Sequence, residues 1–503
     1  MSRTRAFQRA ALPSIPAGRR RRLGLALAAG LAFGLPAVAS ADVVQAPAAS
    51  TFRDSVGVEM HSTFTGYAYA NDPVSVLALR LKYLGIGHVR EFACLDTEAN
   101  CVAPRTRVGQ LASALAPNRL SPGAPGLKFD YGVTPEIHQV PARADRDAYI
   151  QRAFDALVSP PLAGTVESIE QNNEPDLEKS TTWAQTVVGD DATIHRLLAM
   201  PKYASLAAVP LLTPPLGRPT ATPTLVAAGW NASQGEVPNF HPYGPAWGGP
   251  ENGPQVACAT GLVALDCVKT LSTNGGAPIA TESGYSTAGY FYTGQSWVSE
   301  KAQGIYEPRI LLENFALGIK RTYLYELLDL KPDYSSVTNG WGLYRSMYIG
   351  GQLRGSVAKP AGNAIHRLQT RIGDLGAAAA PGSLDLSITG ADGTAVPSST
   401  VRRVLLRRAD GSYALALWQP KSVFDNTMWQ QHDLAVADLP ITVKLNSSVA
   451  GGWSETTFRP SVDASATQSS GSVFTVPVGA DVTLIDLRGS GAGTIPGGDV
   501  TLR

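Results

Sequence analysis

The chain has 503 residues, of which 44% are hydrophobic and 17% are charged. Because the charged share lies below the ~25% typical of soluble domains and apolar residues are plentiful, a disordered or strongly charged chain is excluded. A formal net charge of +1 also argues against the basic surface of a nucleic-acid-binding protein.

The first 41 residues differ from the rest. They hold seven Arg and no acidic residue, continue with an apolar stretch at 23–38, and end in Ala-Ser-Ala at 39–41. This order is typical of a cleaved export signal, so we predict secretion to the extracellular or periplasmic space. The alternative is a membrane anchor, but the apolar stretch is shorter than the ~20 residues that span a bilayer. We expect no stable membrane insertion. The remainder carries 35 basic and 41 acidic residues.

Four cysteines form two pairs that are close in sequence. Cys94 and Cys101 lie seven residues apart, and Cys258 and Cys267 lie nine apart. Four cysteines allow three connectivities, and local pairing would link the ends of one loop in each case. A zinc site is the alternative, but neither pair has C-x2-C spacing or an accompanying pair of histidines. Given the expected export, we predict two disulfides.

Short β-branched or aromatic runs recur through the first two thirds of the chain. They cover residues 55–61, 86–92, 128–134, 166–173, 207–213, 237–243, 278–283 and 321–327. Each interval leaves room for a helix; the clearest spans 298–319, where Pro308 predicts a kink or a new helical start. This rhythm predicts a (β/α)8 TIM barrel. A doubly wound sheet is the alternative, but no Gly-rich phosphate loop follows the first strand.

After residue 374 the helical periodicity stops. Strand-like runs follow at 384–389, 401–408, 413–418, 441–445, 455–459, 473–478 and 482–487. Asp410-Gly411 predicts a hairpin turn between two of them. We therefore predict a small C-terminal antiparallel β-sandwich, and three segments in all: a signal peptide at 1–41, a catalytic barrel at 42–374 and the sandwich at 375–503. The sandwich either binds carbohydrate or packs against the barrel, and we favour packing.

Two glutamates end strands that face one another across the expected barrel. Glu174 follows the fourth strand and Glu282 lies at the end of the seventh. Active sites of such barrels lie at the carboxyl ends of the strands. Two carboxyls ~5 Å apart serve a retaining glycosidase, in which one protonates the leaving oxygen and the other attacks the anomeric carbon. A single Glu would more often form a surface ion pair, but the two together predict a catalytic pair.

Other strands also end in polar residues. These are Arg90, His138, His241 and Tyr243. Arg90 alternatively pairs with its neighbour Glu91. His61, His138 and His241 would suit a metal-dependent hydrolase, but no H-x-H or H-E-x-x-H spacing supports a metal site. We predict neither a metal nor a cofactor.

In this order the residues resemble the clan A glycoside hydrolases, most closely the family 5 and family 39 branches, over about residues 50–350. The likeness of Asn173-Glu174-Pro175 to the clan's fourth-strand signature implies that Glu174 is the general acid/base and that Asn173 binds the sugar 2-hydroxyl. Glu282 matches the nucleophile of the seventh strand. The resemblance further implies that Arg90 and Tyr243 keep Glu282 ionised and oriented. It places the remaining matches, His138 and His241, at the substrate.

One departure concerns strand eight. Family 5 usually places a Trp there as a platform for the sugar, whereas residues 321–327 contain none. We expect Tyr325 or Trp341 to take its place as a substrate-binding residue.

The combined prediction is a secreted, monomeric retaining glycoside hydrolase that cleaves β-glycosidic bonds in a polysaccharide or oligosaccharide. A transglycosylase would use the same residues and differ only in its acceptor. A non-catalytic carbohydrate-binding protein is the third reading, although a binder has no need of both an acid and a nucleophile.

Overall fold

The computed structural model of the chain describes residues 42–489 with short gaps. The gaps are residues 63, 65, 93–103, 116–125, 246–247, 259–260, 290–296, 334–335, 374–379, 428–429, 447–452 and 463–467. The expected signal segment and the pair Cys94 and Cys101 therefore lie outside the described residues. Within the described part of the chain, no helix is both long and apolar enough to cross a membrane.

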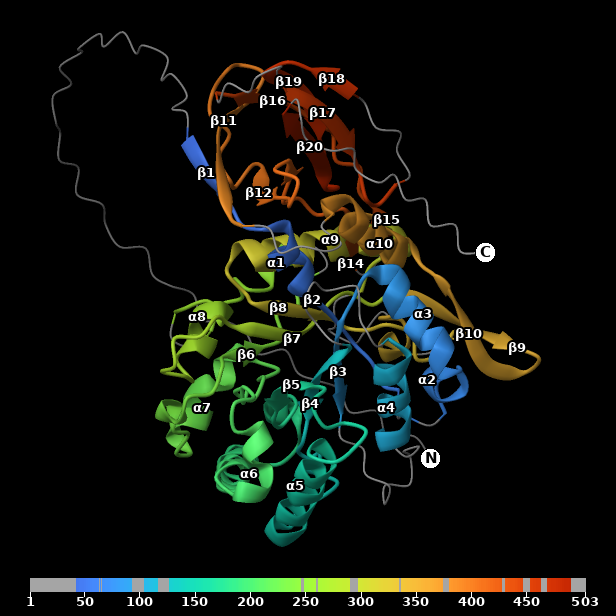
Figure 1. Cartoon of the computed structure of the whole chain (residues 1–503), viewed down its shortest axis with the longest axis vertical. Helices are drawn as coiled ribbons and strands as arrows, with labels where there is room; N and C mark the ends of the chain where they lie inside the picture. The colour runs from blue at the N-terminus through green and yellow to red at the C-terminus, as the bar shows by residue number, and fades with distance from the viewer. Residues whose placement is uncertain are drawn as a thin grey trace, which may run out of the picture. The chain divides into compact units, whose positions relative to one another are not determined.

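A curled parallel sheet forms the first half of the fold, with strand order β5-β4-β3-β2-β8-β7-β6 (Figure 1). Its strands are β2 Val56–Glu59, β3 His88–Phe92, β4 Lys128–Gly132, β5 Val166–Glu170, β6 Asn239–Phe240, β7 Ile279–Ser283 and β8 Arg321–Leu324. Parallel bridges from Ile169 to Leu211 and from Leu212 to Val237 join β5 to the start of β6. These bridges complete the (β/α)8 barrel, and its eight strand positions confirm the prediction.

The fifth strand position is short. Leu211 and Leu212 form backbone hydrogen bonds to Ile169 on one side and to Val237 on the other. Pro210 and Pro214 flank this pair. Because proline has no N–H to donate, the ladder cannot extend far in either direction.

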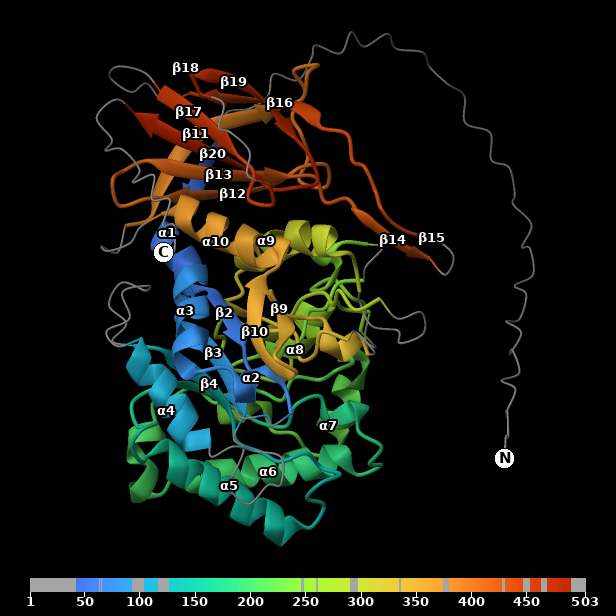
Figure 2. The ribbon, with the colours of Figure 1, turned by 90° about the vertical axis from the view of Figure 1, so that its right-hand side faces the viewer.

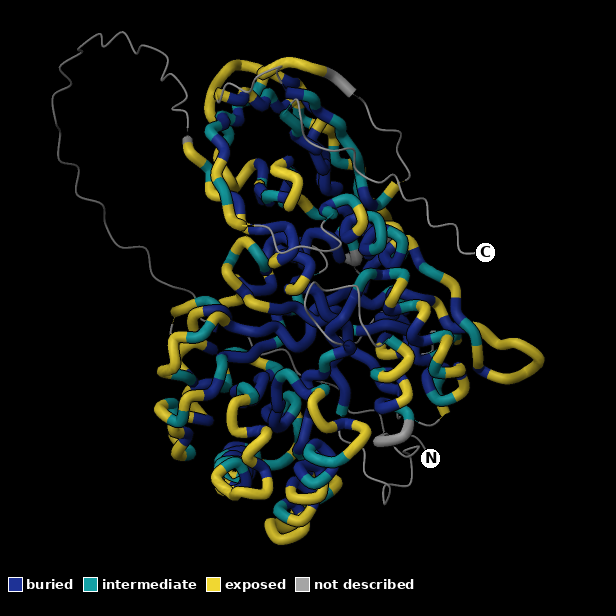
Figure 3. Tube along the Cα trace, viewed as in Figure 1, coloured by how far each residue is buried: buried dark blue, intermediate teal, exposed yellow. Residues whose placement is uncertain are grey.

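Helices surround the barrel strands. They are α1 Ala49–Asp54, α2 Ala68–Asn71, α3 Val74–Leu84, α4 Pro104–Ala114, α5 Arg143–Leu157, α6 Trp183–Leu198, α7 Thr222–Ala227, α8 Ala264–Lys269, α9 Glu300–Ala316 and α10 Pro360–Ile372. Figure 3 shows the strands buried and the outer helices exposed on one side. The Ser299 hydroxyl caps α9 by accepting the N–H of Ala302, and the helix runs through Pro308, so no new helical start occurs there.

Two antiparallel sheets form the C-terminal part, with orders β1-β11-β16-β19 and β12-β13-β20-β17-β18 (Figure 2). The first contains β1 Asp42–Ala46, β11 Gly382–Thr389, β16 Leu439–Leu445 and β19 Val473–Val478. The second contains β12 Arg402–Arg407, β13 Tyr413–Trp418, β17 Trp453–Phe458, β18 Gln468–Ser470 and β20 Thr483–Gly489. This confirms the predicted β-sandwich. Sequence patterns did not reveal that β1, from before the barrel, pairs with β11.

Two hairpins complete the described strands: β9 Tyr344–Ile349 with β10 Gln352–Ala358, and β14 Phe424–Thr427 with β15 Gln430–Asp433. The predicted turn at Asp410-Gly411 joins β12 to β13, and Gly411 adopts a positive φ of 82° there. Glycine adopts this left-handed conformation without strain because it has no Cβ.

Strand β13 is buried on both faces. Leu415 and Leu417 belong to the core between the two sheets, whereas Ala414, Ala416 and Trp418 belong to a core shared with the barrel. Because side chains alternate along a strand, an uninterrupted apolar run is what such a position requires.

A buried carboxylate joins the barrel to the sandwich. Glu251 accepts hydrogen bonds from Arg309 on α9 (2.7 and 2.5 Å) and from the indole N–H of Trp418 on β13 (2.7 Å). Arg309 also donates to the backbone oxygen of Lys421 (2.8 Å). These bonds fit the expectation that the C-terminal strands pack against the barrel.

Candidate active site

Arg90 lies on β3 and is fully buried. Its Nε and Nη2 donate to Glu170 on β5 (2.8 and 2.5 Å), and its Nη1 donates to Glu59 on β2 (2.6 Å) and to Glu282 on β7 (2.5 Å). Burial alone would lower the pKa of Arg90, but the charges of these carboxylates raise it. Arg90 is therefore a permanent positive charge beside Glu282.

Arg90 does not pair with its neighbour Glu91, which was the alternative. Successive side chains of a strand point to opposite faces. Glu91 instead accepts the backbone N–H and the hydroxyl of Ser62 (3.0 and 2.5 Å).

Glu282 is held at both carboxylate oxygens. Oε1 accepts from Arg90, and Oε2 accepts the Tyr243 hydroxyl at 2.7 Å. Burial would raise the pKa of Glu282, but the charges of His241 and Arg90 and the hydrogen bond from Tyr243 together lower it. The Tyr243 hydroxyl itself keeps its proton, because burial and the charge of Glu282 raise its pKa well above the usual value. Glu282 is thus an ionised, fixed carboxylate.

Glu174 has an unusual backbone conformation. Its φ and ψ are 40° and 48°, and no other non-glycine residue among those the structure describes has a positive φ. Such a conformation costs ~1–3 kcal/mol and is often found at functional sites. The Glu174 N–H donates to the oxygen of Pro215 (3.0 Å), and a short 3-10 turn, Pro175–Leu177, follows. This backbone conformation sets the direction of the Glu174 side chain just after β5.

His241 links the two glutamates. Its Nδ1 lies 2.8 Å from Glu174 Oε1 and 3.5 Å from Glu282 Oε2. Its Nε2 lies 3.1 Å from the Thr281 hydroxyl, which donates to Asn239 (2.8 Å) and therefore accepts from His241. Burial would lower the pKa of His241, but Glu282 and Glu174 raise it. Nε2 therefore carries a proton, and the raised pKa favours a second proton on Nδ1, facing Glu174.

The two carboxylates are close together. One oxygen of Glu174, one of Glu282 and one ring nitrogen of His241 lie within 4.8 Å of one another. The Glu174 side chain is 24% exposed and that of Glu282 is 8% exposed. The same barrel end therefore presents one accessible and one buried carboxyl group.

Three further predicted residues lie beside this pair. Asn173 accepts a hydrogen bond from Arg90 Nη2 at 2.8 Å. Trp341 packs edge-on against Tyr243 and Tyr325, with ring centroids 5.2 and 5.6 Å apart. Of the two aromatic candidates for the missing strand-eight Trp, Trp341 thus contacts Tyr243, which holds Glu282, and Tyr325 contacts Trp341.

The structure separates the three histidines of the alternative metal site. His61 lies 3.3 Å from the Tyr325 hydroxyl, and burial lowers its pKa to about 3. His138 is exposed and pairs with Glu178 (3.1 Å) instead of with the catalytic candidates. Among the described residues, each of the three groups that could hold a metal contains a single histidine. A triad of His61, His138 and His241 is therefore wrong, and substrate binding by His138 stays a prediction.

Sequence reasoning missed the acidic residues around Arg90. Glu59 and Glu170 end β2 and β5, and Asp130 lies on β4. Burial raises the pKa of Glu59 and of Asp130 well above the usual values. The sequence does contain a signal for these acids, because each is a charged residue inside a short apolar run. A charged side chain in such a buried strand is expected to face the barrel interior.

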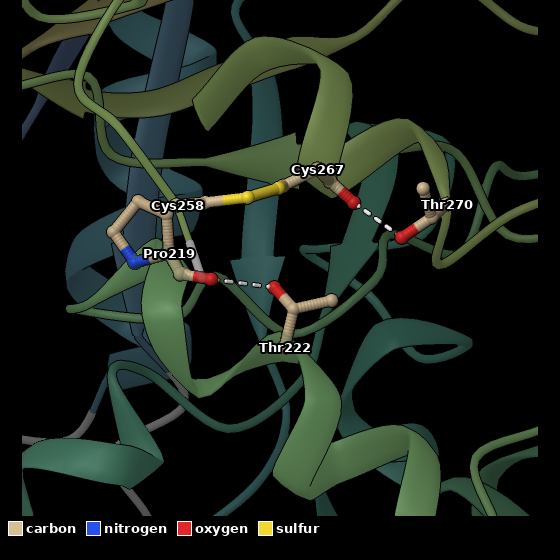
Figure 4. Close-up of a disulfide and its surroundings, with 5 residues drawn as sticks. All are labelled: Pro219, Thr222, Cys258, Cys267 and Thr270. Carbon is tan, nitrogen blue, oxygen red and sulfur yellow. Dashed lines mark hydrogen bonds between the residues drawn. A yellow bond between two sulfur atoms is a disulfide. The ribbon is translucent and has the colours of Figure 1, made fainter. Parts of the chain in front are cut away.

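One predicted disulfide is present. Cys258 and Cys267 are bonded, as Figure 4 shows. Cys267 lies in α8, and its backbone oxygen accepts the Thr270 hydroxyl (2.6 Å); nearby, the Thr222 hydroxyl donates to Pro219 (2.8 Å). The loop before α8 is thereby tied to that helix.

The sequence matches no model of a known family and no characterised protein. Similar solved structures include a glucosidase from Croceicoccus marinus, with a TM-score of 0.55 and 12% identity over 87% of this chain and 96% of that one. A family 39 glycoside hydrolase from Bacteroides cellulosilyticus WH2 has a TM-score of 0.49 and 12% identity over 88% and 82%. A family 51 α-L-arabinofuranosidase from Bifidobacterium longum has a TM-score of 0.46 and 10% identity over 89% and 98%. The match to the glucosidase confirms the expected resemblance to glycoside hydrolases at the level of the fold.

Proposed function

We propose that the protein is a retaining glycoside hydrolase that cleaves β-glycosidic bonds by double displacement. The observation that carries this proposal is the spacing of Glu174 and Glu282, one oxygen of each lying within 4.8 Å of the other. Retaining glycosidases place their carboxyls ~5–5.5 Å apart, whereas inverting enzymes need ~6.5–9.5 Å to fit a water molecule. The short spacing favours retention.

In this mechanism Glu282 is the nucleophile. Its ionised state is supported by Arg90, Tyr243 and His241, which lower its pKa despite burial. Two hydrogen bonds fix its orientation. A fixed anion can attack an anomeric carbon without first giving up a shell of water.

Glu174 is the general acid and then the general base. In the first step it gives its proton to the leaving oxygen while Glu282 bonds to the anomeric carbon and the glycosidic bond breaks. In the second step it takes a proton from water, whose oxygen displaces Glu282 and releases the sugar. The hydrogen bond between His241 Nδ1 and Glu174 Oε1 (2.8 Å) keeps the acid oriented toward the site.

The neighbouring residues suit a sugar ligand. The Asn173 side-chain oxygen is engaged by Arg90, which directs its amide N–H groups toward other acceptors such as a sugar 2-hydroxyl. Tyr325 and Trp341 offer apolar ring surface of the kind on which sugars stack. A polysaccharide or oligosaccharide is the proposed substrate.

Export is part of the proposal. It rests on the arginine-rich and apolar segments of residues 1–41 and agrees with the disulfide between Cys258 and Cys267. Mass spectrometry of protein recovered from the culture medium or periplasm would test it, and we expect a mature N-terminus at residue 42.

The decisive experiment is a screen of aryl β-glycosides, β-glucan, mannan and xylan, with the anomeric configuration of the first product read by NMR. We expect retention. Glu282→Gln should abolish turnover, whereas Glu300→Gln, which alters an exposed ion pair with Arg345, should not. Inverted product, or turnover by Glu282→Gln near the wild-type rate, would contradict the proposal.

The acid/base role has its own signature. Glu174→Ala should retain the first step on substrates with good leaving groups, and added azide should restore the second step because it needs no general base. An equal loss on substrates with good and poor leaving groups would count against Glu174. Binding of glycans without turnover of any substrate would favour the carbohydrate-binding alternative.

A further inference from the structure

A second cluster of possible ligands lies away from the catalytic pair. Asp191 and His195 are one turn apart on α6, which places them on one face of that helix. Glu236 immediately precedes Val237, the residue that bridges to Leu212. His195 Nε2 lies 2.7 Å from Glu236 and 3.6 Å from Asp191. One ligand atom from each of these three residues lies within 4.8 Å of the others.

The charges of this cluster are poorly balanced. The side chains of Asp191 and Glu236 are 5% and 0% exposed. Within 4 Å, no Arg or Lys of the described residues pairs with either carboxylate, whereas the adjacent Asp190 pairs with Arg146 and Arg143. His195 offers at most one positive charge to two buried carboxylates. Buried charges are normally paired or bound to a metal.

An unsatisfied atom points to a missing ligand. Glu236 Oε2 is buried and has no hydrogen-bond partner. Leaving a buried carboxylate oxygen unpaired is costly. Asp191, by contrast, is held in place by the Gln171 amide (3.2 Å), which also donates to the oxygen of Leu212. Such outer hydrogen bonds are typical of carboxylates that bind metals.

We propose that Asp191, His195 and Glu236 form a site for a divalent cation, with Zn²⁺ as the ion that fits best. Two carboxylate oxygens and one imidazole nitrogen are ligands that zinc accepts, with water in the fourth position. The His195 side chain is 28% exposed, which leaves a route for the ion and room for the water.

The cation would tie α6 to the segment that opens β6. Through Gln171 it would also brace the chain three residues before Glu174. The site is structural in this proposal, since none of its three ligands touches the catalytic pair.

The test is a calorimetric titration of the full chain, first stripped with EDTA, with ZnCl₂ alone. We expect saturable binding by the wild type and an affinity at least 100-fold weaker in His195→Gln. The matched control is His138→Gln, which alters a different group of possible ligands and should bind zinc like the wild type. Glu236→Gln provides a second variant, and circular dichroism checks that each variant folds.

A wild type that shows no saturable zinc binding would overturn the proposal. So would unchanged affinity in His195→Gln, because the ion would then occupy another group. The melting temperature should rise with zinc in the wild type and in Glu282→Gln but not in His195→Gln. Since these readouts need no sugar, their failure is distinguishable from failure of the glycosidase proposal.

Discussion

Tyr243 provides the sharpest test of how Glu282 is kept ionised. Its hydroxyl donates to Glu282 Oε2 at 2.7 Å and is buried with it. Tyr243→Phe removes one donor and keeps the ring that packs against Trp341. The ionised form of Glu282 loses a stabilising bond, whereas the protonated form can donate elsewhere. The pKa of Glu282 should therefore rise.

The size of the shift follows from the bond. A hydrogen bond to a charged group contributes ~1.5–3 kcal/mol, and 1.36 kcal/mol corresponds to one pH unit. We expect the pKa of Glu282 to rise by about 1–2 units. Because the low-pH limb of kcat/KM reports ionisation of the nucleophile in the free enzyme, that limb should move to higher pH by the same amount.

The assay is a pH profile of kcat/KM on whichever aryl glycoside the screen identifies. Tyr203→Phe is the matched control, because its hydroxyl also donates to a carboxylate at 2.7 Å, that of Asp155, away from the site. The control should keep the wild-type profile. A low-pH limb that stays in place in Tyr243→Phe, or that moves equally in Tyr203→Phe, would refute the reasoning.

Three further predictions concern stability. Arg90→Met should cost ~3–5 kcal/mol in urea unfolding, because it leaves buried carboxylates unpaired. Lys202→Met, at an exposed pair with Asp155, should cost far less, because solvent screens an exposed ion pair. Burial raises the pKa of Glu307 to about 8. The folded protein therefore holds this proton more tightly than the unfolded chain, and the resulting stability is lost as pH rises from ~4.5 toward 8. The unfolding free energy of Glu307→Gln should accordingly depend less on pH than that of the wild type. Replacing Cys258 and Cys267 by Ser should lower the unfolding free energy by ~2–3 kcal/mol, as expected for a loop of this length, and an unchanged melting curve would contradict that estimate.

Much of the barrel follows from local sequence. The eight apolar runs coincide with strand positions because strands that are buried on both faces are rich in apolar residues. Where the prediction was less accurate, the cause is non-local. The pairing of β1 with β11 joins residues 42–46 to 382–386, and no periodicity in either segment specifies its partner.

The candidate site also contains residues that local sequence predicts and residues that depend on non-local contacts. Glu174, Glu282, Arg90, His241 and Tyr243 lie together, as predicted, because strand order brings the carboxyl ends of the barrel strands to one end of the barrel. His138 lies on a loop, and its partner Glu178 was set by the path of that loop. The buried acids Glu59 and Asp130 escaped notice because their significance depends on which strand faces Arg90, which is a property of the closed barrel.

These buried acids explain how one arginine can serve the proposed nucleophile, Glu282. Arg90 contacts Glu59, Glu170 and Glu282, so three ionised carboxylates would share its single charge. Burial raises the pKa of Glu59, and burial together with Glu170 raises that of Asp130, which favours the protonated form of both groups. Fewer ionised carboxylates then compete with Glu282 for the charge of Arg90.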